Sequence, residues 1–223
     1  MTSCDENKKT VSSNENKQRQ LDSVSKKENL LSLNNAKQLL EDGDLVTRSD
    51  NDIESLTLQN FSRREQVYSH SGIAFKENNE FVVYNAMGGT ENPGAAFRRD
   101  LFDSFVNPSE KTGFAIFKYQ LSGAEVEKLH RILKTNHTQK IPFDISFNLK
   151  SNDSLYCSEM IYKGLKTATN NRVILPSSVI ENFKPKVMGY KLTNVFIKKF
   201  EFIGIDDLYL NPFCKEITRV KYK

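Results

Sequence analysis

The chain has 223 residues, with 32 lysines and arginines against 28 aspartates and glutamates, so its formal net charge is only +4. Such a weak basic excess does not indicate a nucleic-acid-binding protein, which usually carries a clustered basic patch. The three cysteines form no CxxC pair, the chain has only three histidines, and no apolar run reaches roughly 18 residues, so the sequence predicts no metal site, no cofactor and no membrane-spanning helix.

Residues 1–29 contain few apolar side chains and are predicted to form a flexible polar tether. They begin Met1-Thr2-Ser3-Cys4, which resembles the end of a bacterial lipoprotein signal, where the cysteine becomes lipidated. The sequence therefore predicts a lipid anchor at Cys4 as the one contact with a membrane. It also predicts a lipoprotein of the bacterial cell envelope, periplasmic or on the outer surface. The alternative is an ordinary exposed cysteine on a solvated tail.

Residues 30–223 are predicted to form one domain, which starts with a helix over about residues 29–42. Leucine and alanine recur there at roughly helical spacing, and Gly43 follows as a signal for the end of the helix. A strand is expected from Asp44. After it comes a loop with a short helix near residues 53–58.

Two β-rich runs, residues 70–75 and 81–86, flank a polar turn and are predicted to pair as a hairpin. A closing loop of two residues within 77–79 would place His70 and Asn85 on the same face of the hairpin. A loop of three residues would place them on opposite faces, because side chains alternate along a strand. The sequence leaves both registers open.

The second half of the domain continues the mixed pattern. Residues 113–119 are expected to form a strand, and the capping box Ser122-Gly123-Ala124-Glu125 starts an amphipathic helix. Residues 143–149 are predicted to be a strand or extended, and residues 158–169 a helix with one buried side. Two further β-rich stretches are residues 191–205 and 217–222. The predicted fold class is α+β, an antiparallel sheet with helices packed on one side.

One cysteine stands where a nucleophile would be activated. Cys157 precedes the predicted helix at residues 158–169, whose unpaired N–H groups and dipole are expected to lower the pKa of the thiol and to bind an oxyanion. His70 starts a strand, whereas His130 lies in the amphipathic helix and His137 in a polar loop. Cysteine and histidine together are the minimum for nucleophilic acyl transfer. Spacing alone leaves open a cysteine that only packs.

Four segments in order along the chain resemble the YiiX/YebB-like branch of the NlpC-type cysteine hydrolases, which are permuted papain-like amidases. They are residues 43–46 (GDLV), 68–73 (YSHSGI), 83–86 (VYNA) and 155–162 (LYCSEMIY), and residues 205–209 (IDDLY) resemble the closing segment of the family. In this branch the histidine strand precedes the cysteine helix, as His70 precedes Cys157 here. The resemblance implies a circularly permuted papain-like fold, either an antiparallel sheet or a partial barrel.

The resemblance also implies site residues. Cys157 becomes the nucleophile, His70 the general base and later acid, and Asn85 the residue that orients the imidazole. Three more side chains, each with a structural role as the alternative, are candidates for contact with the oxyanion or the substrate: Tyr68, Tyr156 and Glu159.

The implied function is hydrolysis of an amide bond through an acyl-cysteine intermediate, by an amidase or peptidase. The expected partner is a cell-envelope substrate such as a peptide, a peptidoglycan fragment or an acyl lipid. One alternative is a lipid acyltransferase or esterase that uses the same dyad. Another is a non-catalytic envelope lipoprotein that binds the substrate without cleaving it.

Overall fold

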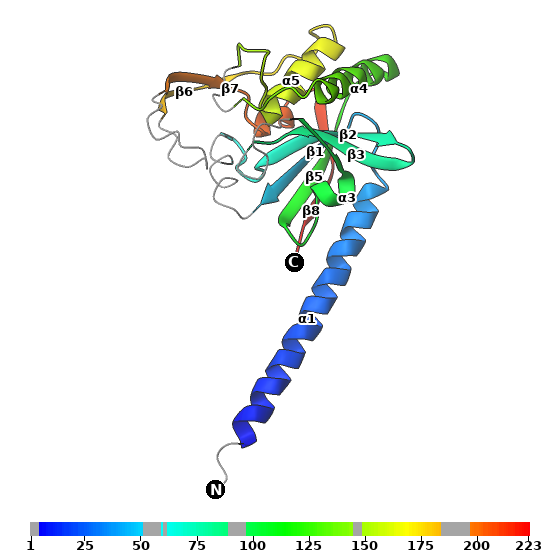
Figure 1. The fold of residues 1–223 in the computed structure, drawn as a ribbon, viewed down its shortest axis with the longest axis vertical. Helices are drawn as coiled ribbons and strands as arrows, with labels where there is room; N and C mark the ends of the chain where they lie inside the picture. The colour runs from blue at the N-terminus through cyan, green and yellow to red at the C-terminus, as the bar shows by residue number, and fades with distance from the viewer. Residues whose placement is uncertain (1–4, 51–58, 60–61, 89–96, 145–148, 184–196) are drawn as a thin grey trace.

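A six-stranded antiparallel sheet in the order β4-β3-β2-β1-β5-β8 forms the centre of the structure (Figure 1). This computed structural model describes residues 5–50, 59, 62–88, 97–144, 149–183 and 197–223. Strands β6 and β7 pair separately as a two-stranded sheet. The elements, in chain order, are α1 (Asp5–Lys37), β1 (Leu45–Asp50), β2 (His70–Glu77), β3 (Glu80–Ala86), β4 (Phe97–Leu101), α3 (Phe102–Phe105), β5 (Lys111–Tyr119), α4 (Gly123–Thr138), α5 (Cys157–Ala168), β6 (Ser178–Phe183), β7 (Ile197–Phe202), the 3-10 helix η1 (Asp206–Leu208) and β8 (Cys214–Lys221).

Both faces of the six-stranded sheet are covered, which corrects the prediction of helices on one side only. Side chains alternate along each strand, so Leu45 of β1 packs in a cluster with residues of α4 and α5, whereas Val46 packs in a second cluster. The second cluster includes Leu33 from α1 and Phe102 and Phe105 from α3. The fold is α+β as predicted, and it has helices on both faces of the sheet.

The hairpin of β2 and β3 closes through a two-residue loop. Asn78 and Asn79 both have positive φ values, 50° and 66°, as the tight turn of a hairpin requires. The register pairs Glu77 with Glu80 and Gly72 with Asn85. This is one of the two registers that place His70 and Asn85 on the same face, and the three-residue alternative is wrong.

Two helices begin close to where the sequence places them. The Ser122 side chain accepts a hydrogen bond from the backbone N–H of Glu125, and the Glu125 carboxylate accepts one from the backbone N–H of Ser122. The capping box of α4 is therefore confirmed. Helix α5 runs from Cys157 to Ala168, so its start and its end each differ from the prediction by one residue. The predicted end of the first helix near residue 42 is wrong, because α1 ends at Lys37; Gly43, with a φ of 87°, lies in the turn between α1 and β1.

The N-terminal region differs from the predicted flexible tether. Helix α1 begins at Asp5 and extends away from the sheet (Figure 1). Lysine, glutamate, glutamine and leucine, which recur along it, are good helix formers, and its end is held because Leu33 and Ala36 are buried. Cys4 lies outside the described residues, so its predicted lipid anchor stays a prediction. Within the described residues, no helix is long and apolar enough to cross a membrane.

Other predicted elements are met only in part. The short helix predicted near residues 53–58 lies outside the described residues. Of the strand predicted at residues 143–149, residues 145–148 also lie outside them, and residues 143 and 144 are not in a strand. Strands β7 and β8 fall within or overlap the β-rich stretches predicted near the C-terminus. Strands β4 and β6 were not predicted, and β4 matters for the site.

Candidate functional site

Cys157 is the first residue of α5, and its side chain is 6 % exposed. The hydroxyl groups of Ser71 and Ser158 and the backbone N–H of Ser158 all act to lower the pKa of the thiol. Burial outweighs them and raises this pKa to about 11. The predicted lowering of the thiol pKa is therefore wrong for the unliganded protein, because the start of α5 is buried rather than open to water.

The start of α5 is fixed to the segment before η1. The Tyr156 hydroxyl accepts a hydrogen bond from the backbone N–H of Ile203 (2.9 Å), and the Ser158 hydroxyl donates one to the Ile203 carbonyl (2.7 Å). Glu159, fully buried, accepts a hydrogen bond from the backbone N–H of Tyr156 (3.2 Å) and pairs with Lys163 (2.7 Å). Tyr156 and Glu159, two candidates for substrate contact, thus have structural partners that hold Cys157 in place.

His70 is the first residue of β2, and its side chain has different neighbours from those of Cys157. Its Nε2 atom lies 3.0 Å from Oδ1 of Asn85, and its ring centre lies 5.6 Å from that of Phe105 in α3. Burial, together with the charge of Arg48 nearby, lowers the pKa of the imidazole to about 3. At neutral pH the imidazole is therefore uncharged, the form that a general base requires.

Asn85 is held in one orientation by β4. Its Nδ2 donates to a carboxylate oxygen of Asp100 (3.0 Å) and to the carbonyl of Val83 (3.2 Å). Both partners can only accept, so Nδ2 must face them and Oδ1 must face His70. Oδ1 then accepts the proton on His70 Nε2, which leaves Nδ1 of the imidazole free to accept a proton.

Asp100 is itself fixed by Arg98. The guanidinium donates to both carboxylate oxygens, with Nε 3.0 Å from Oδ2 and an Nη atom 2.8 Å from Oδ1. Burial acts to raise the pKa of Asp100, but the hydrogen bonds from Arg98 and Asn85 lower it below its ordinary value. Arg98, Asp100, Asn85 and His70 form a continuous hydrogen-bonded row, which we name the imidazole row. Asp100 and Arg98 were missed as site residues, because only the pairing of β3 with β4 places them beside Asn85.

The structure brings His70 and Asn85 together but does not join either to Cys157. Among the described residues, no hydrogen bond links the Cys157 thiol to the His70 imidazole. The side chain beside the thiol is that of Ser71, the next residue along β2. Because neighbouring strand residues point to opposite sides, His70 would reach the thiol only around the start of β2.

The remaining histidines and Arg99 have structural contacts instead. His130 bonds Glu77 (2.7 Å between Nε2 and Oε1) and stacks on Phe75 with 4.2 Å between ring centres. His137 lies edge-on to Tyr84. Arg99, the residue before Asp100 on β4, pairs with Glu77 (2.7 Å).

Comparison with known proteins shows a likeness of fold. No protein-family model matches the chain, and no curated protein matches it. A solved structure, described as the metalloprotein YiiX from Escherichia coli O157:H7, DUF1105, matches with a TM-score of 0.62 and 16 % identity. The match covers 81 % of this chain and 98 % of that one. The chain therefore has a YiiX-like fold, and at this identity the likeness shows the fold alone.

That protein's description raises the question of a metal. Among the described residues of this chain, no group of three or more histidine, cysteine, aspartate or glutamate side chains is arranged to hold a metal ion. His70 faces an amide oxygen and Cys157 faces hydroxyl groups. The residues present at the candidate site thus do not fit a metal centre.

Proposed function

We propose that the protein is a cysteine-dependent hydrolase that cleaves an amide bond through an acyl-cysteine intermediate, with Cys157 as the nucleophile and His70 as the base. The observation that carries the proposal is the imidazole row. The 3.0 Å contact between His70 Nε2 and Asn85 Oδ1 orients a neutral imidazole with Nδ1 left for a proton. A buried, oriented and uncharged histidine is one of the groups that acyl transfer requires, and the cysteine at the start of α5 is the other.

The reaction would start from a neutral pair rather than from a thiolate and an imidazolium. As the sulfur of Cys157 attacks the carbonyl carbon, its proton passes to Nδ1 of His70. The oxyanion is stabilised by backbone N–H groups at the start of α5. His70 then gives the proton to the leaving amine as the C–N bond breaks, and water hydrolyses the thioester to release the acid and the thiol.

The proposal requires that the thiol and the imidazole approach each other when substrate binds. Catalytic hydrogen bonds are often long or absent in unliganded enzymes and form only in the substrate complex. Cys157 lies beside Ser71, and His70 points to the opposite side of β2, so the imidazole has to turn around the start of the strand to reach the thiol. The proposed substrate is an amide of the cell envelope, such as a peptide or a peptidoglycan fragment. The proposed lipid anchor at Cys4 would hold the protein there.

A second candidate is a non-catalytic binding protein, favoured by the raised pKa of the thiol and by the missing contact between Cys157 and His70. The two candidates are separated by whether the thiol is ever acylated. Mass spectrometry of the intact protein, after incubation with cell-wall fragments and with phospholipids, should show an acyl adduct that maps to Cys157 and is absent from Cys157→Ser. Cys214→Ser is the matched control and should acylate as the parent does.

The same experiment distinguishes hydrolysis from acyl transfer. An added amine or alcohol would collect the acyl group from a transferase, whereas a hydrolase would release the free acid. If no substrate acylates Cys157, or if adducts form equally on Cys157 and Cys214, the proposal of a cysteine hydrolase fails and the binding protein is preferred.

A further inference from the structure

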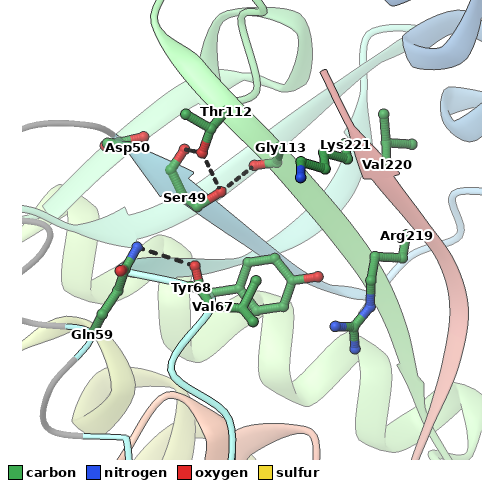
Figure 2. A pocket seen from close by; sticks show the side chains of 10 residues that line it. All are labelled: Ser49, Asp50, Gln59, Val67, Tyr68, Thr112, Gly113, Arg219, Val220 and Lys221. Carbon is green, nitrogen blue, oxygen red and sulfur yellow. Dashed lines mark hydrogen bonds between the residues drawn. The ribbon is translucent and has the colours of Figure 1, made fainter. Parts of the chain in front are cut away.

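A pocket of about 360 Å³ opens where β1, β5 and β8 meet the segment that precedes β2 (Figure 2). Ser49 and Thr112 line one side, and their hydroxyl groups hydrogen-bond each other at 2.7 Å. Tyr68 forms the opposite wall, and Arg219 and Lys221 of β8 lie at the rim. Neither the imidazole row nor α5 contributes a lining residue, so the pocket is distinct from the groups described above.

The wall of the pocket carries a buried hydroxyl group without a partner. Tyr68 is 2 % exposed, and its ring is held edge-on by Phe117 and Tyr209. Its hydroxyl lies beside that of Thr47, which acts to lower the pKa of Tyr68, but within the described residues neither hydroxyl has a partner at good hydrogen-bond geometry. A buried hydroxyl left unpaired costs about 1–3 kcal/mol, so such groups normally have a polar partner. The pocket is the place where such a partner could bind.

The charges at the rim indicate the sign of the partner. Arg219 pairs with Glu65 and, at 2.8 Å, with Glu216, so its charge is already balanced. Asp50 is balanced by Lys111, with 3.4 Å between Nζ and Oδ2. Lys221 is exposed at the rim, and no ion pair engages its ammonium group within the described residues. The pocket thus offers an unpaired cation and an unpaired hydroxyl donor, a combination that suits an anion.

The pocket also lies on the side of the sheet that carries the thiol. Thr47 and Ser49 are two residues apart on β1 and share a face. Thr47 stands directly opposite Ser71 on β2, and Ser71 lies beside Cys157. Tyr68, Thr47 and Ser71 all have buried hydroxyl groups without an ordinary hydrogen bond among the described residues. We name these three the hydroxyl row, and it runs from the wall of the pocket through the buried interior to Ser71 beside the thiol.

We infer that the pocket binds the carboxylate end of the substrate, with Lys221 and Tyr68 as its ligands, while the scissile amide lies along the hydroxyl row at Cys157. This inference rests on the proposed function and narrows it to peptides with a free carboxylate. Thr47 and Ser71 are fully buried, so the interior between the pocket and α5 must open as the substrate enters. Their hydroxyl groups then bond the polar backbone of the substrate, and the acyl carbonyl reaches the start of α5.

The test is a binding experiment that needs no turnover. N-acetyl-trialanine is titrated into full-length Cys157→Ser as the free acid and as the C-terminal carboxamide, and the Kd is measured by calorimetry. The acid should bind about tenfold more tightly than the amide, as one charge-assisted hydrogen bond predicts. The additional change Lys221→Gln should remove this preference. The matched control Lys215→Gln, on the same strand outside the pocket, should keep it.

Tyr68→Phe separates a ligand contact from a structural one. It should weaken binding of the acid several-fold while the free energy of unfolding without ligand stays equal or rises, because the hydroxyl has no partner to lose. Equal affinities of the acid and the amide, no binding of either, or a preference that survives Lys221→Gln would overturn the inference. Failure of the proposed function would look different: the acid would still bind selectively, but no substrate would acylate Cys157.

Discussion

The imidazole row and the hydroxyl row lie at the start of the same strand and differ in almost every physical respect. In the imidazole row each side chain is bonded to the next, from Arg98 through Asp100 and Asn85 to His70. In the hydroxyl row three buried hydroxyl groups lack an ordinary partner within the described residues. One region has its hydrogen bonds complete before a substrate arrives, and the other has donors and acceptors still to be satisfied.

This difference indicates separate roles for the two rows: one orients the base, and the other binds the substrate near the nucleophile. A complete network fixes one geometry, and in a buried setting it resists rearrangement. Unpaired buried hydroxyl groups reduce the stability of the unliganded protein, and a polar ligand that bonds them recovers this free energy on binding. The orientation of the base is thus prepared by folding, whereas the surroundings of the nucleophile await the substrate.

The largest effect should come from removing the base. His70→Ala is expected to lower kcat/KM for an acylating substrate by roughly 10²- to 10⁴-fold, the usual contribution of general acid–base catalysis. His137→Ala should leave kcat/KM unchanged, since His137 only lies edge-on to Tyr84. If the two variants lose activity equally, the imidazole row has no part in the chemistry.

The next largest effect should be on the free energy of unfolding, when a member of the imidazole row is replaced. Asn85→Leu leaves Asp100 and His70 without their shared partner, so the free energy of unfolding should fall by about 1–3 kcal/mol for each buried group left unpaired. Chemical denaturation measures this loss. A loss below about 0.5 kcal/mol, the usual range for surface substitutions, would mean that the row is not the tight network described above.

A smaller effect on catalysis is expected from Asp100→Asn. An asparagine at this position can present a donor to Asn85, so the Asn85 amide no longer has a single orientation and the proton on His70 no longer has a fixed nitrogen. We expect kcat to fall about tenfold, roughly 1.4 kcal/mol, while KM is unchanged. A rise in KM with kcat unchanged would instead place Asp100 among the groups that bind substrate.

The pH dependence of alkylation tests the surroundings of the thiol. Burial raises the pKa of Cys157 to about 11 and that of Cys214 to about 12. Only the thiolate reacts, so alkylation of Cys157 and of Cys214 by iodoacetamide should be slow at neutral pH and should rise as the pH approaches the raised pKa of each thiol. Rapid alkylation of Cys157 at pH 7 would show that the thiol is activated without substrate.

The smallest effect should come from the hydroxyl row. Thr47→Val removes a buried hydroxyl that has no ordinary partner, so the free energy of unfolding should change by less than about 0.5 kcal/mol or should increase. Thr169→Val is the contrasting change, because the Thr169 hydroxyl donates to the Leu165 carbonyl (2.8 Å). A large loss of stability in Thr47→Val would show that this hydroxyl is already bonded.

Local signals in the sequence predict a good part of the fold. The capping box at Ser122 and the alternating residues of the hairpin each depend on neighbours within a few positions, so α4 and the β2–β3 pair are predicted well. The sequence leaves the choice among hairpin registers open, because the register depends on which residues occupy the turn. Asn78 and Asn79 settle it, since asparagine tolerates the positive φ that both positions adopt.

Properties that depend on the assembled molecule are not predicted. The predicted shift of the Cys157 pKa has the wrong direction. The groups at the helix start lower this pKa, but burial against β2 and the segment near Ile203 raises it by more. Asp100 is invisible as a site residue because β4 has no clear strand pattern and reaches Asn85 only through tertiary pairing. The position of Tyr68 as an aromatic wall is within reach of the sequence, but its unpaired hydroxyl is not.

Helix α1 has a mechanical consequence. Its 33 residues span about 50 Å at 1.5 Å per residue. Asn29 exchanges two hydrogen bonds with the backbone of Lys223, at 3.0 and 2.9 Å, and Lys223 also pairs with Glu28 at 2.8 Å. These contacts attach the C-terminal half of α1 to the chain segment that follows β8, while the N-terminal half extends away from the sheet. Any tension applied near Asp5 would therefore be delivered at Asn29, next to β8, the strand that carries Arg219 and Lys221 to the rim of the pocket.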